Sequence, residues 1–192
     1  EFITGEGGVI DTWLRRGAAG FRLDVADELP DDFIEKIRAA VKRVSPEKFL
    51  LGEVWEDATT KYGFGQRRTY LLGKGLDSVM NYPFKNAVLD FVKGKPAEQA
   101  MGEILSICEH YPAPAMDTAL NFLSTHDTER ALTVIADEPA NGRGREWQSG
   151  RCVTGEAYEE GMLRLRMAYA IIYTLPGVPC LYYGDEIGMQ GY

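Results

Sequence analysis

Residues 20–28 contain an arginine and an aspartate in a pattern that could do chemistry. The stretch is Gly-Phe-Arg-Leu-Asp-Val-Ala-Asp-Glu, in which apolar residues alternate with Arg22, Asp24 and Ala26. Alternation of period two predicts a β-strand, and residues i and i+2 of a strand share a face, so Arg22 can reach Asp24. Both side chains are costly to bury unless they pair. The stretch therefore indicates either a buried structural ion pair or a carboxylate whose negative charge Arg22 stabilises for catalysis.

A second carboxylate lies near the end of an apolar run. Residues 49–54 are Phe-Leu-Leu-Gly-Glu-Val, and Trp55 follows them. A nearly continuous apolar run is typical of a strand that is covered on both faces. Glu53 has no partner in the neighbouring sequence, which favours a functional role over a structural one. Trp55 is open to two interpretations, a place in the core or a platform for a ligand.

A third polar group follows a later apolar stretch. Residues 124–130 are Ser-Thr-His-Asp-Thr-Glu-Arg, which places His126 beside Asp127. A lone histidine is as often structural as functional, but an adjacent carboxylate favours function. Asp127 could instead cap the helix that follows, and Thr128 could take that place.

The three carboxylates are far apart in the sequence, 29 residues from Asp24 to Glu53 and 74 from Glu53 to Asp127. If each follows a parallel strand, the carboxyl ends of the strands bring them to one rim. Carboxylates on one rim repel each other, which favours one of them as a proton donor. A charged carboxylate beside a protonated one is the pair of groups that a retaining glycosidase uses.

Strands and helices are predicted to alternate along the chain. Strands are expected at residues 20–25, 49–54, 76–80, 119–124 and 177–183, and helices at 8–16, 30–44, 83–92, 97–110, 128–136 and 158–174. This alternation predicts a parallel sheet with right-handed crossovers. Residues 57–75 and 137–155 are predicted loops, and Arg143–Arg151 is interpreted as solvated surface. The residues of the last helix that are predicted to face the core are Leu163, Met167, Ala170 and Ile171.

Composition excludes several classes of function. The 192 residues are 45% hydrophobic and carry a formal charge of −8, which argues against a nucleic-acid or anionic membrane surface. No apolar run reaches the roughly 20 residues of a membrane span, and no glycine-rich phosphate fingerprint follows a strand. The three cysteines, Cys108, Cys152 and Cys180, are too scattered for a metal site or a disulfide framework, which favours a reducing, cytoplasmic compartment. The first residues do not resemble a signal peptide.

The two strand motifs resemble those of the α-amylase family of glycoside hydrolases. Residues 20–28 resemble the strand-four motif of that family, which implies that Asp24 is the nucleophile and Arg22 its partner. Residues 50–55, Leu-Leu-Gly-Glu-Val-Trp, resemble the strand-five motif and imply that Glu53 is the general acid/base. In a retaining enzyme the two carboxyl groups are expected about 5–5.5 Å apart.

Two later motifs extend the resemblance. Residues 121–130 are similar to the strand-seven motif, which implies that His126 binds substrate and Asp127 stabilises the transition state. Residues 177–191 are similar to the strand-eight segment. Four motifs in the family's order make this a specific resemblance, and it implies retaining hydrolysis of α-glucosidic bonds with an α-glucan or maltooligosaccharide as partner.

The resemblance also suggests a subgroup. True α-amylases have Lys-His after the nucleophile strand, and the cyclomaltodextrinase and neopullulanase subgroup has Asn-Glu, whereas this chain has Asp27 and Glu28. Glu28 and residues 76–84 match the second subgroup, and Glu28 and Trp55 join the substrate-binding residues. The implied substrates are α-1,4-glucans or cyclodextrins. The alternatives are a glucosyl transferase or isomerase of the same family, or a non-catalytic relative, which would typically lack the carboxylates.

The expected architecture is α/β, a portion of a TIM (β/α)₈ barrel comprising about strands four to eight. Such a barrel takes about 250 residues, so residues 1–192 are expected to form a partial catalytic domain. The upstream strands, the inserted loop domain and a C-terminal β-domain are then outside the chain. The resemblance implies no cofactor and no metal ligand in this chain, and it leaves open whether calcium binds in the missing part. A partial barrel would expose two sheet edges, which predicts self-association.

Overall fold

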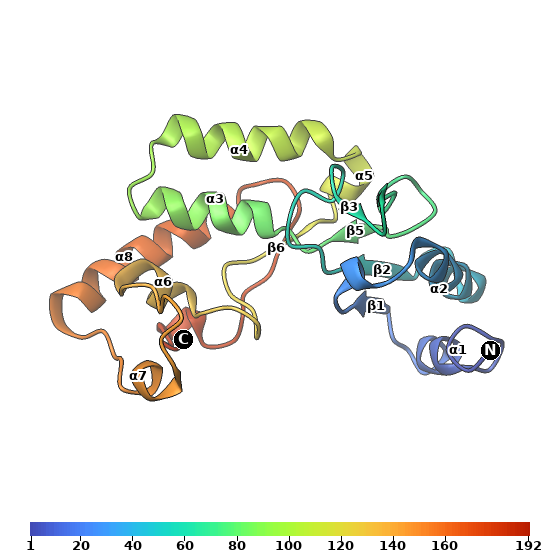
Figure 1. Cartoon of the computed structure of the whole chain (residues 1–192), viewed down its shortest axis with the longest axis horizontal. Coiled ribbons are helices and arrows are strands. Elements are labelled where there is room, and N and C mark those ends of the chain that lie inside the picture. The colour runs from blue at the N-terminus through green and yellow to red at the C-terminus, as the bar shows by residue number, and fades with distance from the viewer. The chain divides into compact units, whose positions relative to one another are not determined.

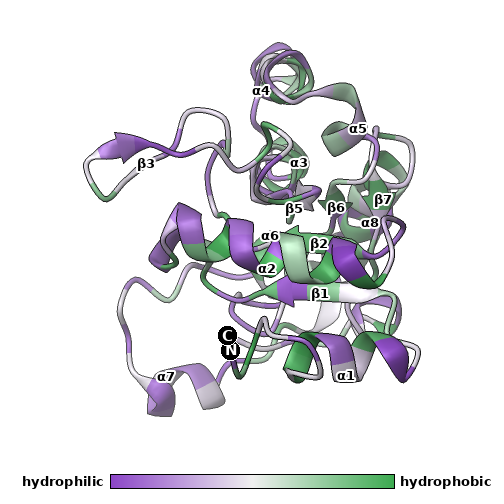
Figure 2. Ribbon diagram, turned by 90° about the vertical axis from the view of Figure 1, so that its right-hand side faces the viewer, coloured by the Kyte–Doolittle hydropathy of each residue, from purple (hydrophilic) through white to green (hydrophobic).

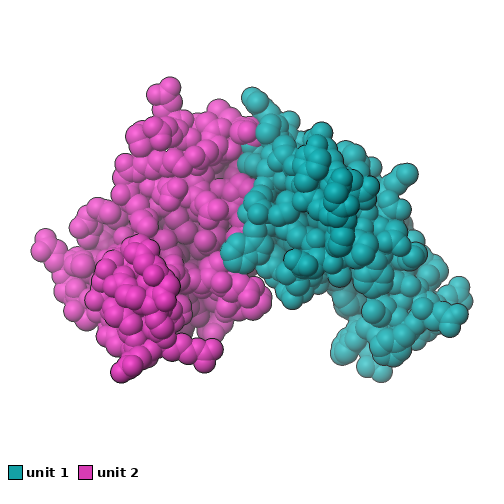
Figure 3. All heavy atoms as spheres, in the orientation of Figure 1, with its two compact units in different colours: residues 1–81, 107–120 teal, residues 82–106, 121–192 magenta.

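The structure is a computed structural model that describes all residues from 1 to 192, and it divides into two compact units. The first unit comprises residues 1–81 and 107–120, and the second comprises residues 82–106 and 121–192 (Figure 3). The main helices are α1 (Val9–Arg15), α2 (Asp31–Val44), α3 (Tyr82–Val92), α4 (Ala97–His110), α5 (Ala113–Met116), α6 (Ala131–Ala136), α7 (Arg145–Ser149) and α8 (Gly155–Ile172) (Figure 1).

The first unit is built on a parallel sheet in the order β1 (Gly20–Leu23), β2 (Phe49–Gly52) and β5 (Ser78–Val79). Gly20 pairs with Phe49 so closely that a Cβ at position 20 would lie 2.0 Å from the Phe49 carbonyl oxygen, which requires glycine there. A parallel bridge joins Met80 to Leu120, the first residue of β6 (Leu120–Asn121). The predicted parallel pairing is therefore confirmed, with shorter strands than expected.

Helix α2 covers this sheet with one apolar face. Its buried residues are Ile34, Ile37, Ala40 and Val41, and Figure 2 shows purple and green alternating along the helix. Helix α2 is also tied to Asp77, the residue before β5, which accepts from Arg38 at 2.7 Å and Lys42 at 2.8 Å. Burial opposes the charge of Asp77, but these hydrogen bonds outweigh it and lower the pKa of Asp77. The helix is thus fixed by apolar packing and by a pair of partly buried ion pairs.

The predicted loop 57–75 contains a short antiparallel hairpin. Its strands are β3 (Tyr62–Gly63) and β4 (Gln66–Arg67). Arg68 follows β4 and is 3% exposed, although it belongs to a loop. The expectation of an irregular segment is wrong here, because Gly65 in a left-handed conformation allows a two-residue turn between the strands.

The second unit is helical around α8, which packs against α3 and α6. Gly161 makes the close approach to α6 possible, since a Cβ at that position would lie 2.7 Å from the Cβ of Ala136. The buried residues of α8 are Gly161, Leu165, Ala168 and Ile172. No helix of the chain combines the length and apolarity needed to cross a bilayer.

The face of α8 that was expected to be buried points outward in this unit. Leu163 is 64% and Met167 44% exposed, Ala170 is also exposed and Ile171 is half-buried. The prediction that these four residues face the core is therefore wrong. The face of α8 that packs against α3 and α6 is a different one. The helix carries two apolar stripes, and its neighbours, not its own sequence, select which stripe is buried.

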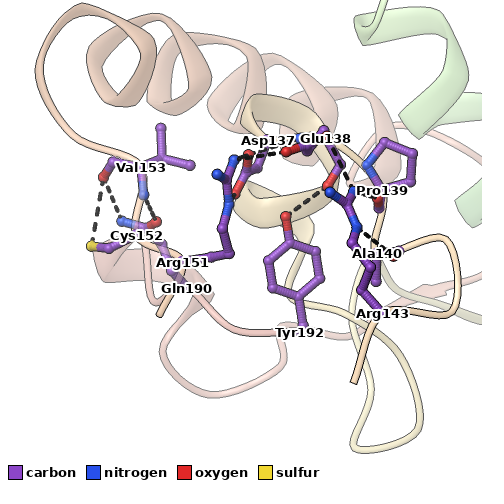
Figure 4. Close-up of polar contacts among 10 residues, drawn as sticks. All are labelled: Asp137, Glu138, Pro139, Ala140, Arg143, Arg151, Cys152, Val153, Gln190 and Tyr192. Atoms are coloured by element: carbon purple, nitrogen blue, oxygen red, sulfur yellow. Dashed lines mark hydrogen bonds and ion pairs between the residues drawn. The ribbon is translucent and has the colours of Figure 1, made fainter. Parts of the chain in front are cut away.

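Residues 137–155 form a braced segment where solvated surface was expected. It contains the short helix α7, and the Trp147 ring lies 3.7 Å from the Arg143 guanidinium carbon and 5.1 Å from the Tyr192 ring. Asp137 pairs with Arg151 through both carboxylate oxygens (Figure 4). The Arg151 hydrogen bonds, aided by Tyr192, lower the pKa of Asp137 to about 2. The interpretation of Arg143–Arg151 as plain surface is therefore wrong in part.

Asp137→Asn is expected to destabilise the chain at neutral pH by about 1 kcal/mol, because Arg151 is partly exposed and its pair is screened by solvent. A lowered folded-state pKa stabilises the fold above the ordinary value of 3.8, and this contribution is lost as the pH falls towards about 2. Urea unfolding should therefore separate the variant from the parent at pH 7 and not at pH 2. The exposed Asp117→Asn is the matched control, and a difference that persists unchanged at pH 2 would contradict the assignment.

Candidate active site

Arg22 in β1 holds two carboxylates at once. Its Nη1 pairs with Asp24, and its Nη2 lies 3.1 Å from Oε1 of Glu53. The second contact is an ion pair and not a hydrogen bond, since the buried Nη2 atom has no hydrogen-bond partner. The Nε atom donates to Sδ of Met80 at 3.5 Å. One guanidinium therefore brings the side chains that follow β1 and β2 together, as the strand pattern predicts.

Glu53 is the buried member of the cluster, with 3% of its surface exposed. Its Oε2 accepts from the backbone N–H of Val25 at 2.7 Å, and its Oε1 accepts from Nε1 of Trp55 at 3.1 Å. Its own backbone is tied to β1, since its N–H donates to the Leu23 carbonyl at 3.0 Å. Two hydrogen-bond donors and the Arg22 ion pair therefore converge on one carboxylate, which suits a group that must hold a fixed orientation during proton transfer.

Asp24 has the opposite environment. Its side chain is 68% exposed, so the alternative of a buried structural ion pair with Arg22 does not hold. Trp55 is 44% exposed, which removes it from the core and leaves part of its ring open beside Glu53. Glu28 is also exposed and lies on a 3₁₀ turn, Ala26–Glu28, that follows Asp24. An open carboxylate next to a buried one is the asymmetry that a nucleophile and a proton donor require.

His126 and Asp127 lie in the second unit, where they form a pair of their own. Nε2 of His126 lies 3.1 Å from Oδ2 of Asp127, and both side chains are exposed. The turn beneath them is closed by Thr125 and Thr128, because the Thr125 N–H donates to Oγ1 of Thr128 at 3.0 Å. Helix α6 begins after Arg130, so neither Asp127 nor Thr128 is its N-cap. Asp127 is thus free of the structural role that the sequence left open for it.

A buried ion pair lies at the end of this turn, and local patterns in the sequence do not predict it. Arg130 binds Asp185 at 3.3 Å and the Tyr183 carbonyl, and its guanidinium lies 4.4 Å from the Tyr182 ring. Tyr169 donates to the other oxygen of Asp185; burial and this bond raise the pKa of Tyr169. Asp185 belongs to the strand-eight segment, residues 177–191, but nothing local in the sequence pairs it with Arg130.

The cysteines are free thiols and are not grouped. No group of three or more His, Cys, Asp or Glu side chains is arranged to hold a metal ion. Burial raises the pKa of Cys108 and Cys180, which makes both poor nucleophiles. The groups that Arg22 brings together are the carboxylates of Asp24 and Glu53.

Comparison with known proteins agrees with this chemistry. An amylopullulanase of Thermoanaerobacter thermohydrosulfuricus is 36% identical over 191 residues, covering 91% of this chain and 12% of the relative. A cyclomaltodextrinase of a Bacillus species is 35% identical over 185 residues, covering 93% of this chain and 27% of the relative. The chain therefore spans about a quarter or less of the length of these curated relatives.

Solved structures give the same result. A ligand-free cyclic α-maltosyl-(1→6)-maltose hydrolase of Arthrobacter globiformis matches with a TM-score of 0.74 and 29% identity, over 95% of this chain and 35% of the other. A debranching enzyme of Nostoc punctiforme matches with a TM-score of 0.72 and 28% identity, over 95% of this chain and 35% of the other. The model of the α-amylase catalytic domain matches residues 5–192. The chain belongs to the α-amylase catalytic-domain family.

Proposed function

We propose that this chain carries the nucleophile and the acid/base of a retaining glycosidase that cleaves α-glucosidic bonds, mainly α-1,4, in starch-derived glucans, maltooligosaccharides or cyclodextrins. The observation that carries the proposal is the guanidinium of Arg22, which is shared between the exposed Asp24 and the buried Glu53. Two carboxylates held on one cation lie close together, and the short spacing is what distinguishes retaining from inverting glycosidases. The class of substrate follows from the relatives, an amylopullulanase and a cyclomaltodextrinase.

Asp24 is the group that attacks the anomeric carbon in this proposal. Its exposed carboxylate can reach a sugar, while Arg22 orients it and stabilises its charge. The bond to the leaving oxygen breaks as the bond to Asp24 forms, and Glu53 gives its proton to that oxygen. In the second half Glu53 takes a proton from water, the water oxygen displaces Asp24, and the sugar is released with its original configuration.

Asp127 and His126 are assigned to the sugar that is being cleaved. Their exposed, paired side chains offer a negative charge and a hydrogen-bond donor to the positively charged, oxocarbenium-like transition state. Trp55 offers an apolar ring beside Glu53, which suits stacking on a sugar face. Glu28 offers a second exposed carboxylate for sugar hydroxyl groups.

The parallel strands are proposed to be consecutive strands, four onwards, of a (β/α)₈ barrel. The support is their order, since β1, β2 and β5 lie in the sheet in the order in which they occur in the sequence, with only the β3–β4 hairpin between β2 and β5. The Met80–Leu120 bridge is parallel as well. Polar side chains follow the carboxyl ends of β1 and β2, where such barrels keep their active sites.

The test is release of reducing sugar from maltoheptaose and β-cyclodextrin. It is made on the 192-residue chain and on the Bacillus cyclomaltodextrinase with its equivalent segment exchanged for this chain. We expect hydrolysis with release of the α-anomer, lost in Asp24→Asn and kept in Asp32→Asn, an exposed aspartate on α2 that serves as the matched control. No hydrolysis by either protein, or release of the β-anomer, would overturn the proposal.

A further inference from the structure

Val25, directly after Asp24, has a strained backbone. Its φ of 42° and ψ of 51° place it in the left-handed region, which a β-branched residue rarely adopts. Its side chain is 49% exposed, so packing of that side chain does not account for the conformation. The backbone N–H of Val25 points to Oε2 of Glu53, 2.7 Å away. Strain of this kind persists only where the surroundings impose it, and it gathers at functional sites.

Arg68 binds the segment that follows Val25, and the Ala26 N–H of that segment also donates to the Glu53 carbonyl at 3.2 Å. Its Nη1 donates to the Asp27 carbonyl at 3.0 Å, its Nη2 donates to the Leu29 carbonyl, and its Nε binds the Asp31 carboxylate at 2.8 Å. Arg68 is 3% exposed, so these bonds are formed away from water. A rigid guanidinium fork thereby fixes two successive turns of backbone after the strain.

The side chain of Asp27 is held from the same direction. Tyr70 donates to one of its oxygens at 2.8 Å, and Lys61 lies 3.1 Å from the other. The Tyr70 ring lies 4.5 Å from the Arg68 guanidinium carbon, so the two residues also support each other. All these donors belong to residues 57–75, the segment that follows Glu53. The segment that follows Glu53 therefore holds the segment that follows Asp24.

We propose that Arg68 is a positioning residue of the reaction, which holds Val25 left-handed so that its N–H stays on Glu53. This inference rests on the proposed function. Without the clamp, Val25 relaxes towards the β region and turns its N–H away from the carboxylate. Arg68 touches neither the substrate nor the reacting atoms, and its contribution reaches Glu53 only through the backbone conformation at position 25.

The decisive experiment is a rescue. Arg68→Lys keeps the charge opposite Asp31 but cannot bind both carbonyls, and we expect kcat to fall about 10- to 100-fold with KM nearly unchanged, since displacement of a positioned group costs turnover. Glycine adopts the left-handed region without strain. Val25→Gly should therefore restore most of the lost kcat in the Arg68→Lys background. Val25→Ala is the matched control, because alanine keeps the Cβ that causes the strain.

A second readout separates this inference from the proposed function. Hydrogen exchange of the Val25 amide, followed by NMR, requires no activity. Exchange should be slow in the parent, fast in Arg68→Lys, and slow again when Val25→Gly, but not Val25→Ala, is added. Rescue by alanine as effective as by glycine, or a protected amide in Arg68→Lys, would overturn the clamp. If the Val25 amide exchanges slowly in the parent and again after Val25→Gly is added to Arg68→Lys, but no protein hydrolyses the substrates, only the proposed function is overturned.

Discussion

Glu53→Gln is expected to lower turnover of maltoheptaose by about 10²- to 10⁴-fold, the range that general acid–base catalysis supplies. Glutamine has the size of glutamate and can still accept the Val25 N–H on its carbonyl oxygen. It cannot give a proton to the leaving oxygen or take one from water. The loss is measured as a fall in kcat by reducing-sugar assay. The assay uses the 192-residue chain or the cyclomaltodextrinase that carries it, whichever hydrolyses maltoheptaose.

The substrate distinguishes this role from others. α-Maltosyl fluoride carries a leaving group that departs without a proton, so the first step should lose far less activity in Glu53→Gln than it loses with maltoheptaose. Asp24→Asn should lose activity on both substrates to the same extent, because no nucleophile remains. Glu47→Gln, the same change at an exposed residue, is the matched control. Equal losses on both substrates in Glu53→Gln would show that Glu53 acts otherwise.

Arg22→Met is expected to have the largest effect on stability. Removal of one partner of a buried ion pair costs up to about 3–5 kcal/mol, because the other charge is left in the interior. Glu53 is that charge, although the donors on Val25 and Trp55 remain and reduce the loss. The free energy of unfolding is measured by urea denaturation at pH 7.

A double-mutant cycle identifies the cause of that loss. In the Glu53→Gln background no buried charge depends on Arg22, so Arg22→Met should cost much less there. Arg145→Met, at an exposed arginine that begins α7, is the matched control and should stay near the parent. A cost of Arg22→Met that is the same in both backgrounds would show that packing against Met80, not charge, is what Arg22 contributes.

Local patterns predicted the elements that position the site. Helices α2 and α4 have the predicted extent to within a residue, because each has an apolar stripe of helical period between clear breaks. The pairing of Arg22 with Asp24 followed from the two-residue period of a strand. Such features depend on neighbours in the sequence, which is why the sequence alone was sufficient for them.

Features that depend on distant partners could not be predicted in this way. Arg67 and Arg68 are adjacent and chemically alike, yet only Arg68 is buried, because the carbonyls that it binds come from another segment. The left-handed conformation of Val25 contradicts the local preference of valine, and in our proposal that same contact holds it. The buried stripe of α8 was wrongly assigned for a related reason, since α3 and α6 decide which side of the helix is covered.

The parallel register of β1 and β2 also bears on how the site forms. Gly20 pairs with Phe49, so 29 residues of chain must close before the two strands meet. Non-local closure of this kind is slow and gains nothing until the pairing is made. Because Arg22 and Glu53 lie on these strands or directly after them, their ion pair cannot form ahead of the sheet. This ion pair is thus formed in the same folding step that brings the two strands of the core together.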